Sequence, residues 1–471
     1  MTSIPEIGTP THAERLSFLI DGEDYFEAFV EAVSLAERSV LILGWEVDSG
    51  IRLRRSRTGG NDLQTLAEFL SATLVSRPEL EVHVNCWDWS MIYVLEREPW
   101  PREKMGRDTH DRLHFELDGK HPVGASHHEK VVVIDDKVAF IGGIDLGRRR
   151  WDTHEHDPDD PRLVSPAGNA YRPFHDVQAV VSGPAARALG DRARFRWRRT
   201  TGEILDPTPE ADHDPWPGVE PAIRDTPLRL VVTDPAENCR ETEAWHVAAI
   251  ESAEKAIYLE NQYLTSHAVG DALTGCLGRT PSPEIVIVTS RESGGWLEQA
   301  SMDAQRACIL GNLAAVDPGG KLATWWPDSG HSDSPTVHTK LTVVDDRHAY
   351  LGSANLSNRS MGLDTEIGLV MDANEAPRLQ ETITDLRRSL LAEHLDTTPE
   401  AVARAERACQ GTIRAVESLR SGRRTLRDLD TSAHPLADII GPVTALFDPE
   451  RPADLGDLVG GLPWSDNDAD G

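Results

Sequence analysis

Two short segments of the chain place a histidine two residues before a lysine: His128 with Lys130, and His338 with Lys340. In an extended strand, residues i and i+2 point to the same face, so each imidazole projects beside an ammonium group. If the two pairs meet, the lysines can neutralise the non-bridging oxygens of a phosphoryl group, while one imidazole attacks phosphorus and the other donates a proton. The residue types therefore predict a phosphoryl-transfer site in which lysine supplies the positive charge that a metal ion supplies elsewhere, with no metal and no cofactor.

The two segments belong to a duplicated sequence. The first histidine and lysine run into the apolar stretch 131–134 and a pair of aspartates, and the same arrangement returns 210 residues later. Each copy is followed by a glycine-containing turn, at 142–145 and at 352–355. Upstream, the apolar strands predicted at 40–43 and 80–84 have counterparts at 257–259 and 284–288. Matched elements in the same order at a near-constant offset indicate two homologous halves.

Short β-branched strands alternate with helical stretches such as 63–74 and 296–313, which is typical of an α/β fold. Residues 206–227 contain six prolines and several acids, so we predict a linker there. The expected organisation is an N-terminal half over 1–205, the linker over 206–227, a C-terminal half over 228–395, and a helical extension with an acidic tail over 396–471.

Composition limits the classes of function. The chain has 48 Lys plus Arg against 78 Asp plus Glu, a net charge of −30, which argues against a sequence-independent nucleic-acid binder. No apolar run of 18 or more residues and no basic, apolar leader are visible, so the expected location is the cytoplasm. The cysteines show no paired spacing and are interpreted as thiols of a reducing compartment: Cys86, Cys239, Cys276, Cys308 and Cys409.

The pattern H-x-K-x4-D followed by G-[GS]-x-[ND], present twice, resembles the signature of the phospholipase D superfamily. The first copy, at 127–135 with 139–146 and 150–152, is more similar to the eukaryotic-type phospholipases D than to the small nucleases of that superfamily. The sequences at 174–185, 258–263 and 358–366 match as well, so the resemblance covers about residues 36–395. It implies two phospholipase D-like α/β sandwich halves, packed as a pseudo-twofold bilobal monomer with the active site at their interface.

The resemblance also implies roles. His128 would be the nucleophile that forms a phosphohistidine, and His338 would protonate the departing alcohol and then activate water. Lys130 and Lys340 would hold the phosphate. Further phosphate contacts would come from three residues of the glycine turns: Asn355, Ser353 and Asp145. Asp145 stands at a position where asparagine is commoner in the superfamily.

The superfamily places a carboxylate behind each catalytic imidazole, where it fixes the tautomer and stabilises the imidazolium. Asp176 matches that position in the first half, and Glu366 matches it in the second. The motif aspartates Asp135 and Asp345 stand at strand ends, and we predict that they hold turns through hydrogen bonds rather than take part in the chemistry.

Three other groups of residues have two interpretations each. The acidic loop with His154 and His156 fits a metal site, but a solvated loop is favoured. The arginines at 52–57 and 148–150 are interpreted as a solvated face, with contact to lipid headgroups as the alternative. The tryptophans are expected to pack in the core more often than to form an interfacial rim: Trp87, Trp89, Trp100 and Trp151.

The favoured function is a phospholipase D-type phosphodiesterase acting on glycerophospholipids at a membrane surface, as a monomer and without a nucleic-acid partner. A phosphatidyl transfer like that of cardiolipin synthases ranks second. A nuclease ranks third, and a catalytically silent binding protein is disfavoured by the intact His, Lys and carboxylate positions. The sequence is also compatible with export of the protein as an effector without a signal.

Overall fold

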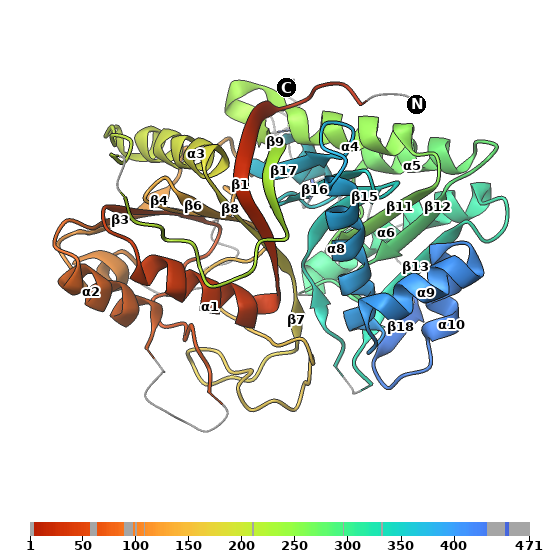
Figure 1. Ribbon diagram of the computed structural model, residues 1–471, viewed down its shortest axis with the longest axis horizontal. Helices are drawn as coiled ribbons and strands as arrows, with labels where there is room; N and C mark the ends of the chain where they lie inside the picture. Colours follow the sequence, from red (N-terminus) through yellow and green to blue (C-terminus); the bar gives the residue numbers. More distant parts are fainter. Residues whose placement is uncertain are drawn as a thin grey trace, which may run out of the picture.

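The computed structural model describes residues 4–56, 64–88, 98, 101–107, 109–209, 212–294, 296–330, 333–430 and 448–451, with the side chains of 296–300 excepted. Figure 1 shows two halves side by side, with the first half from red to yellow and the second from green to blue. The tryptophans Trp89 and Trp100, the arginine Arg57 and nearly all of the acidic tail lie outside the described residues.

The first half alternates strands and helices. Its elements are β1 (Thr9–Ile20), α1 (Asp21–Ser34), β2 (Ser39–Gly44), α2 (Leu66–Ser76), β3 (Glu81–Trp87), the π-helical turn η2 (Glu103–Arg107), β4 (Leu113–Asp118), β5 (Val131–Ile134), β6 (Val138–Gly142), β7 (Phe174–His175), β8 (Val177–Ser182) and α3 (Pro184–Thr201).

The second half repeats this order and then continues. Its elements are β9 (Ile223–Asp234), the 3-10 turn η3 (Pro235–Glu237), β10 (Cys239–Arg240), α4 (Glu241–Ser252), β11 (Ala256–Asn261), α5 (His267–Leu277), β12 (Glu284–Val288), α6 (Trp296–Val316), β13 (Leu322–Asp328), β14 (Thr336–Val337), β15 (Lys340–Val344), β16 (His348–Gly352), α7 (Asn358–Gly362), β17 (Glu366–Asp372), α8 (Leu379–His394), α9 (Pro399–Cys409), α10 (Thr412–Leu419) and β18 (Thr425–Asp428).

One mixed sheet runs through both halves. Over the described residues its order is β18-β13-β12-β11-β15-β16-β17-β9-β1-β8-β6-β5-β2-β3-β4, with β10 also paired to β9. Apart from β10 and β18, the six strands on one side of the central β9–β1 pair, from β17 to β13, correspond in order to the six on the other side, from β8 to β4. A duplicated chain with pseudo-twofold symmetry has this arrangement. β1 and β9 run antiparallel, with Thr9 opposite Leu230 and Leu16 opposite Ile223, and Figure 1 shows them side by side between the halves. Backbone hydrogen bonds therefore join the halves directly.

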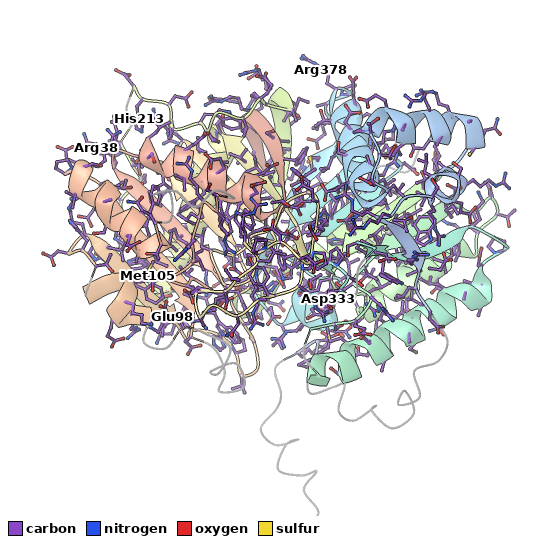
Figure 2. All side chains as sticks on the ribbon, turned by 90° about the horizontal axis from the view of Figure 1, so that it is seen from below. Arg38, Glu98, Met105, His213, Asp333 and Arg378 are labelled. Carbon is purple, nitrogen blue, oxygen red and sulfur yellow. The ribbon has the colours of Figure 1, made fainter. Side chains whose placement is uncertain are left out.

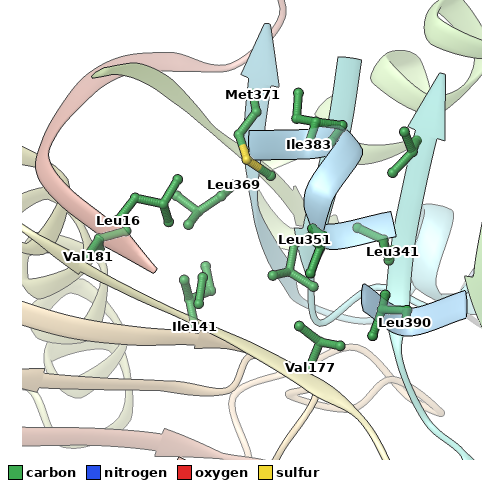
Figure 3. Packing of buried hydrophobic residues seen from close by; sticks show 14 of the residues in the cluster. Leu16, Ile141, Val177, Val181, Leu341, Leu351, Leu369, Met371, Ile383 and Leu390 are labelled. Carbon is green, nitrogen blue, oxygen red and sulfur yellow. The ribbon is translucent and has the colours of Figure 1, made fainter. Parts of the chain in front are cut away.

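A shared apolar core covers one face of this sheet where the halves meet. Leu16, Val177 and Val181 of the first half belong to the same buried cluster as Leu351 and Leu369 of the second. Figure 3 shows these side chains facing one another across the β1–β17 region. Burial of apolar surface stabilises a fold by roughly 25 cal/mol per Å². The junction of the halves is therefore part of the protein core rather than a loose domain contact.

Two predicted boundaries were wrong. Residues 223–227, assigned to the linker, are the first residues of β9, because Ile223 and Thr226 are buried at spaced positions against the sheet in spite of Pro227. In the extension, which was predicted to be helical, residues 425–428 form β18 on the free edge of β13. Leu426 is fully buried there, and four residues are too few for a periodic pattern to identify a strand.

Among the described residues, the five cysteines named above form no disulfide bond. Within the described residues, none of the helices has the length and apolar character needed to cross a lipid bilayer.

Candidate active site

The two His-Lys motifs meet at the seam between the halves, where backbone hydrogen bonds fix them in matching ways. The His128 N–H donates to the Thr365 carbonyl oxygen at 3.0 Å, and the His338 N–H donates to the His175 carbonyl oxygen at 2.8 Å. The second contact extends a two-stranded parallel sheet formed by β14 and β7. In each case the acceptor directly precedes a carboxylate residue in the chain, namely Glu366 or Asp176.

Each motif histidine is held by the carboxylate of the other half. His128 Nδ1 lies 3.0 Å from Glu366 Oε1, and His338 Nδ1 lies 2.7 Å from Asp176 Oδ2. One carboxylate was predicted in each half, and the structure shows that each carboxylate pairs with the histidine of the other half. Because Nδ1 is occupied in both rings, Nε2 is the nitrogen that each ring can offer to a reacting group.

The two motif lysines are buried and have matching partners. Lys130 Nζ donates to its own motif's His128 carbonyl oxygen at 3.0 Å and lies 3.3 Å from Asp145 Oδ2. Lys340 Nζ donates to the His338 carbonyl oxygen, and to Gln262 Oε1 at 3.3 Å. The ammonium groups are thereby fixed beside the imidazoles, as the i and i+2 spacing predicted.

Burial and the clustered cations favour neutral imidazoles. Desolvation, with the charges of Lys130 and Lys340, holds the pKa of His128 well below its usual value. Desolvation, with Lys340 and Arg150, does the same for His338. Desolvation also lowers the pKa of Lys340 to about 7. A bound phosphodiester anion would oppose these shifts, because it adds negative charge at the point where the cations gather.

The two carboxylates share a dry environment. Desolvation raises the pKa of Glu366 to about 8, with Asp364 as a further cause, and raises that of Asp176 to about 7. Both side chains are fully buried. Each can therefore share a proton with its imidazole, which suits a pair that must take up and release a proton in turn.

The glycine-turn residues occupy different places. Ser353 donates to Glu366 Oε2 at 2.5 Å, so its hydroxyl positions that carboxylate. Asp145 accepts from the Trp45 N–H at 2.9 Å in addition to its contact with Lys130, which suits a residue that positions the lysine. Asn355 Oδ1 is buried with no hydrogen-bond partner among the described residues. Asp145 Oδ2 likewise has no hydrogen bond among the described residues, but it pairs with the Lys130 ammonium group.

The motif aspartates lie at strand ends. Asp135 accepts backbone N–H groups from residues 37–39 at 2.7–2.8 Å, and its second oxygen accepts from His213 Nε2 at 2.7 Å. Asp345 accepts the N–H groups of residues 254–256 at 2.7–2.9 Å. Arg38 and His213, labelled in Figure 2, lie on the outer side of the first half, away from the seam. Both aspartates thus hold a turn to the start of a neighbouring strand.

Sequence reasoning missed a further cation at the site. Arg150 was grouped with a solvated basic face, yet its guanidinium stacks over Phe174 at 5.0 Å, and its charge lowers the pKa values of His338 and Lys340. Its Nε is buried with no hydrogen-bond partner among the described residues. Its position two residues before Asp152, in a segment already matched to the superfamily, was the available signal.

The other basic and aromatic residues mostly belong to the scaffold. Arg148 binds Asp48, and Arg55 donates to the Tyr171 hydroxyl at 2.8 Å. Trp87 and Trp151 are almost fully buried, as expected for core residues.

The loop with the two histidines was predicted to be solvated, and for His156 and Asp152 that prediction was wrong. Both side chains are about 1% exposed, and His156 Nδ1 pairs with Asp152 Oδ2 at 2.8 Å. His154 is 44% exposed. Carboxylates from α1 and α8 surround the loop, and this arrangement depends on tertiary contacts that no local pattern reveals.

The family model described as "Cardiolipin synthase, PLD-like domain" matches residues 247–386, which include the second His-Lys motif. Among curated relatives, phospholipase D A of Dictyostelium discoideum is 23% identical, over 81% of this chain and 35% of its own length. Phospholipase D alpha 1 of Vigna unguiculata is 24% identical, over 82% of this chain and 66% of its own. Phospholipase D1 of Saccharomyces cerevisiae is 24% identical, over 83% of this chain and 29% of its own length.

The fold has a counterpart of similar size. The crystal structure of a phosphatidylserine synthase from Haemophilus influenzae superimposes with a TM-score of 0.56, covers 94% of both chains and is 14% identical. The chain spans only about a third to two thirds of the length of the curated relatives named above. The duplicated motifs, the two-half fold and these matches together support the phospholipase D superfamily as the family that this chain resembles.

Proposed function

We propose that the protein cleaves the phosphodiester bond between the phosphatidyl group and the headgroup of glycerophospholipids through a phosphohistidine at His128. The observation that carries the proposal is the crossed pairing, in which His128 is held by Glu366 and His338 by Asp176. This pairing leaves the Nε2 atom of each ring available, and in the proposed reaction the two atoms would act on opposite sides of one phosphate. The names of the curated relatives support a phospholipid as substrate, and the charge of −30 disfavours a nucleic acid.

The chemistry would proceed in two displacements. In the first, Nε2 of His128 bonds to phosphorus while the bond to the headgroup oxygen breaks, and His338 gives that oxygen a proton. In the second, water attacks phosphorus, gives a proton to His338 and breaks the P–N bond, which releases phosphatidic acid. Throughout, Lys130 and Lys340 balance the charge on the non-bridging oxygens.

Arg150 and Asn355 would complete the phosphate site. Among the described residues, the buried Nε of the Arg150 guanidinium has no hydrogen-bond partner, and the charge of this group lowers the pKa of His338. The Asn355 amide would donate to phosphate through its nitrogen. We assign Asp145 and Ser353 to holding Lys130 and Glu366, in place of the phosphate contacts that the resemblance implied.

A second candidate is transfer of the phosphatidyl group to an alcohol. The matched family model carries the description "Cardiolipin synthase, PLD-like domain". The same phosphohistidine would serve both reactions, and only the acceptor in the second displacement differs. Products formed from phosphatidylglycerol separate the two: phosphatidic acid and glycerol indicate water as acceptor, and cardiolipin with release of glycerol indicates transfer to the hydroxyl of a second phosphatidylglycerol.

The test of the proposed substrate class is a comparison of phosphatidylcholine vesicles with single-stranded DNA, each with and without EDTA. Release of choline and phosphatidic acid with no cleavage of DNA is expected. Because lysines supply the charge at phosphorus, brief EDTA treatment should leave the rate on a soluble phosphodiester unchanged. Cleavage of DNA without release of choline would contradict the proposal, and Lys130→Met is the matched inactive control.

A further inference from the structure

A second cluster of ionisable side chains lies at the seam, next to the catalytic residues but separate from them. It brings together the start of α1, the loop after β6, strand β7 and the end of α8. We call it the seam cluster, and its members are Asp21, His156, His175 and Glu393. Three of the side chains are at most 1% exposed, and the Glu393 side chain is 8% exposed.

The distances within the seam cluster match those of a metal coordination shell. Asp21 Oδ1 and Glu393 Oε1 each lie 2.9 Å from His175 Nδ1. His156 Nε2 lies 3.1 Å from the same Glu393 oxygen and 3.5 Å from Asp21 Oδ2. A tetrahedral site with ligands about 2.0 Å from Zn²⁺ has edges of about 3.3 Å. Two ring nitrogens and three carboxylate oxygens thus lie at contacts of 2.9–3.5 Å, which bracket this edge, and one atom from each of the four residues can be chosen so that all four lie within 4.8 Å of one another.

The outer ring nitrogens of both histidines are also arranged as in metal sites. His156 Nδ1 pairs with Asp152 Oδ2 at 2.8 Å, and His175 Nε2 pairs with Glu260 Oε1 at 2.7 Å. In metal centres, a ligating histidine almost always donates its other N–H to a carboxylate or carbonyl oxygen, which fixes the tautomer. Both rings of the seam cluster have this arrangement, and in both the remaining nitrogen points at the cluster centre.

Two polar atoms of the seam cluster point to an additional ligand. Among the described residues, Asp21 Oδ2 and His175 Nδ1 are buried and take part in no hydrogen bond of good geometry, although oppositely charged groups lie 2.9–3.5 Å from them. Burying a carboxylate oxygen without a partner is costly, so native proteins usually satisfy such atoms. A cation bound between them would satisfy both atoms at once.

We propose that the seam cluster binds one divalent first-row metal ion, with Zn²⁺ as the ion that fits its geometry and its ligand types. The ion would be structural, because the four protein ligands leave no open position for water or substrate. It would join α1 and the loop after β6 to α8 of the second half. It would also hold Asp176, whose carbonyl oxygen accepts from the Asp21 N–H at 2.8 Å and whose carboxylate holds His338. This goes beyond the proposed reaction, in which the metal takes no part.

The test is the metal content of the tag-free protein, measured by inductively coupled plasma mass spectrometry after dialysis against Zn²⁺ and then against metal-free buffer. About one equivalent is expected in the wild type, and less than about a tenth in Asp21→Asn and in His156→Asn. Co²⁺ added to the stripped protein should give the visible absorption of a tetrahedral site. His114→Asn is the matched control, because His114 also pairs with a carboxylate, Glu81, but lies half-exposed on β4.

Wild-type measurements keep the proposal testable if the variants do not fold. Removing the ion should lower the midpoint of thermal unfolding, and one equivalent of Zn²⁺ should restore it. A wild type that retains no metal after the Zn²⁺ dialysis would overturn the proposal and leave two doubly protonated imidazoles in the cluster. Metal retained at one equivalent by both folded variants would overturn its placement. Neither result depends on activity, so neither bears on the proposed phosphohistidine.

Discussion

At the scale of single residues, the site depends on which carboxylate holds which imidazole. Glu366 holds His128 across the seam at 3.0 Å, and Ser353 in turn holds Glu366 at 2.5 Å. When His128 becomes positively charged in the reaction, Glu366 can give up its proton and stabilise that charge, whereas in Glu366→Gln the amide keeps the shape but cannot ionise. We expect kcat to fall about 10²–10⁴-fold, as in other carboxylate–histidine pairs. Ser353→Ala leaves the carboxylate in place, so its kcat for choline release should fall far less. An equal fall in kcat for the two variants would contradict the larger role assigned to Glu366.

The raised pKa of Glu366 also predicts how stability depends on pH. Its carboxyl has an ordinary pKa of 4.5, and burial raises it to about 8. Between these values the folded chain keeps a proton that the unfolded chain has released, so stability falls as pH rises through this window, by at most about 1.4 kcal/mol per pH unit. Glu366→Gln should flatten the pH dependence of the thermal midpoint between pH 5 and about 8. An unchanged slope would mean that Glu366 is already ionised at pH 5.

The sequence was sufficient to find the two His-Lys motifs that the structure brings together at the seam, because two matched copies make an accidental pattern rare. It could not predict the crossed pairing of Glu366 and Asp176. That pairing depends on how β7 meets β14, and two-residue strands carry no periodic signal. Arg150 and His156 were misjudged for the same reason, since a charged residue in a loop looks solvated until its tertiary partners are known.

At the scale of elements, the motif aspartates act as clamps between strands. Asp345 accepts three backbone N–H groups at the start of β11, at 2.7–2.9 Å. Asp345→Ala leaves these donors without their acceptor, and we expect a loss of about 1–3 kcal/mol in stability. Asp345→Asn keeps one acceptor oxygen, so its free energy of unfolding should fall less. Activity per folded molecule should stay within about threefold of wild type, because the clamp touches no reacting atom.

Activity and circular dichroism melts on the same Asp345 samples separate the structural role from a chemical one. A fully folded Asp345→Asn protein without turnover would show that the aspartate takes part in the reaction. The elements themselves followed from sequence where they were long and periodic: the helices predicted at 63–74 and 296–313 correspond to α2 and α6. Strand β18 could not be predicted in this way, because it forms by pairing with the edge of β13 rather than through a periodic pattern of its own.

At the scale of the whole molecule, each half supplies one histidine, one lysine and the carboxylate of the other half's histidine. A protease site placed in the linker after Gly218, between Pro209 and Pro221, should therefore give a nicked protein that stays joined and active, because β1–β9 pairing and the shared core hold it together. Halves separated in denaturant and refolded alone should be inactive, and mixing should restore turnover. Appreciable turnover by either half alone would contradict a shared site.

The most direct test of the account is intact-mass spectrometry after reaction with a phosphodiester whose leaving group is p-nitrophenolate. This leaving group needs no proton, so His338→Ala should still transfer the phosphoryl group to His128. The adduct should then persist, because the residue proposed to activate water is gone. We predict an adduct on His338→Ala and none on His128→Ala, with the double variant as control. An adduct on His128→Ala alone would reverse the two roles, and no adduct on either would contradict the phosphohistidine and favour direct attack by water.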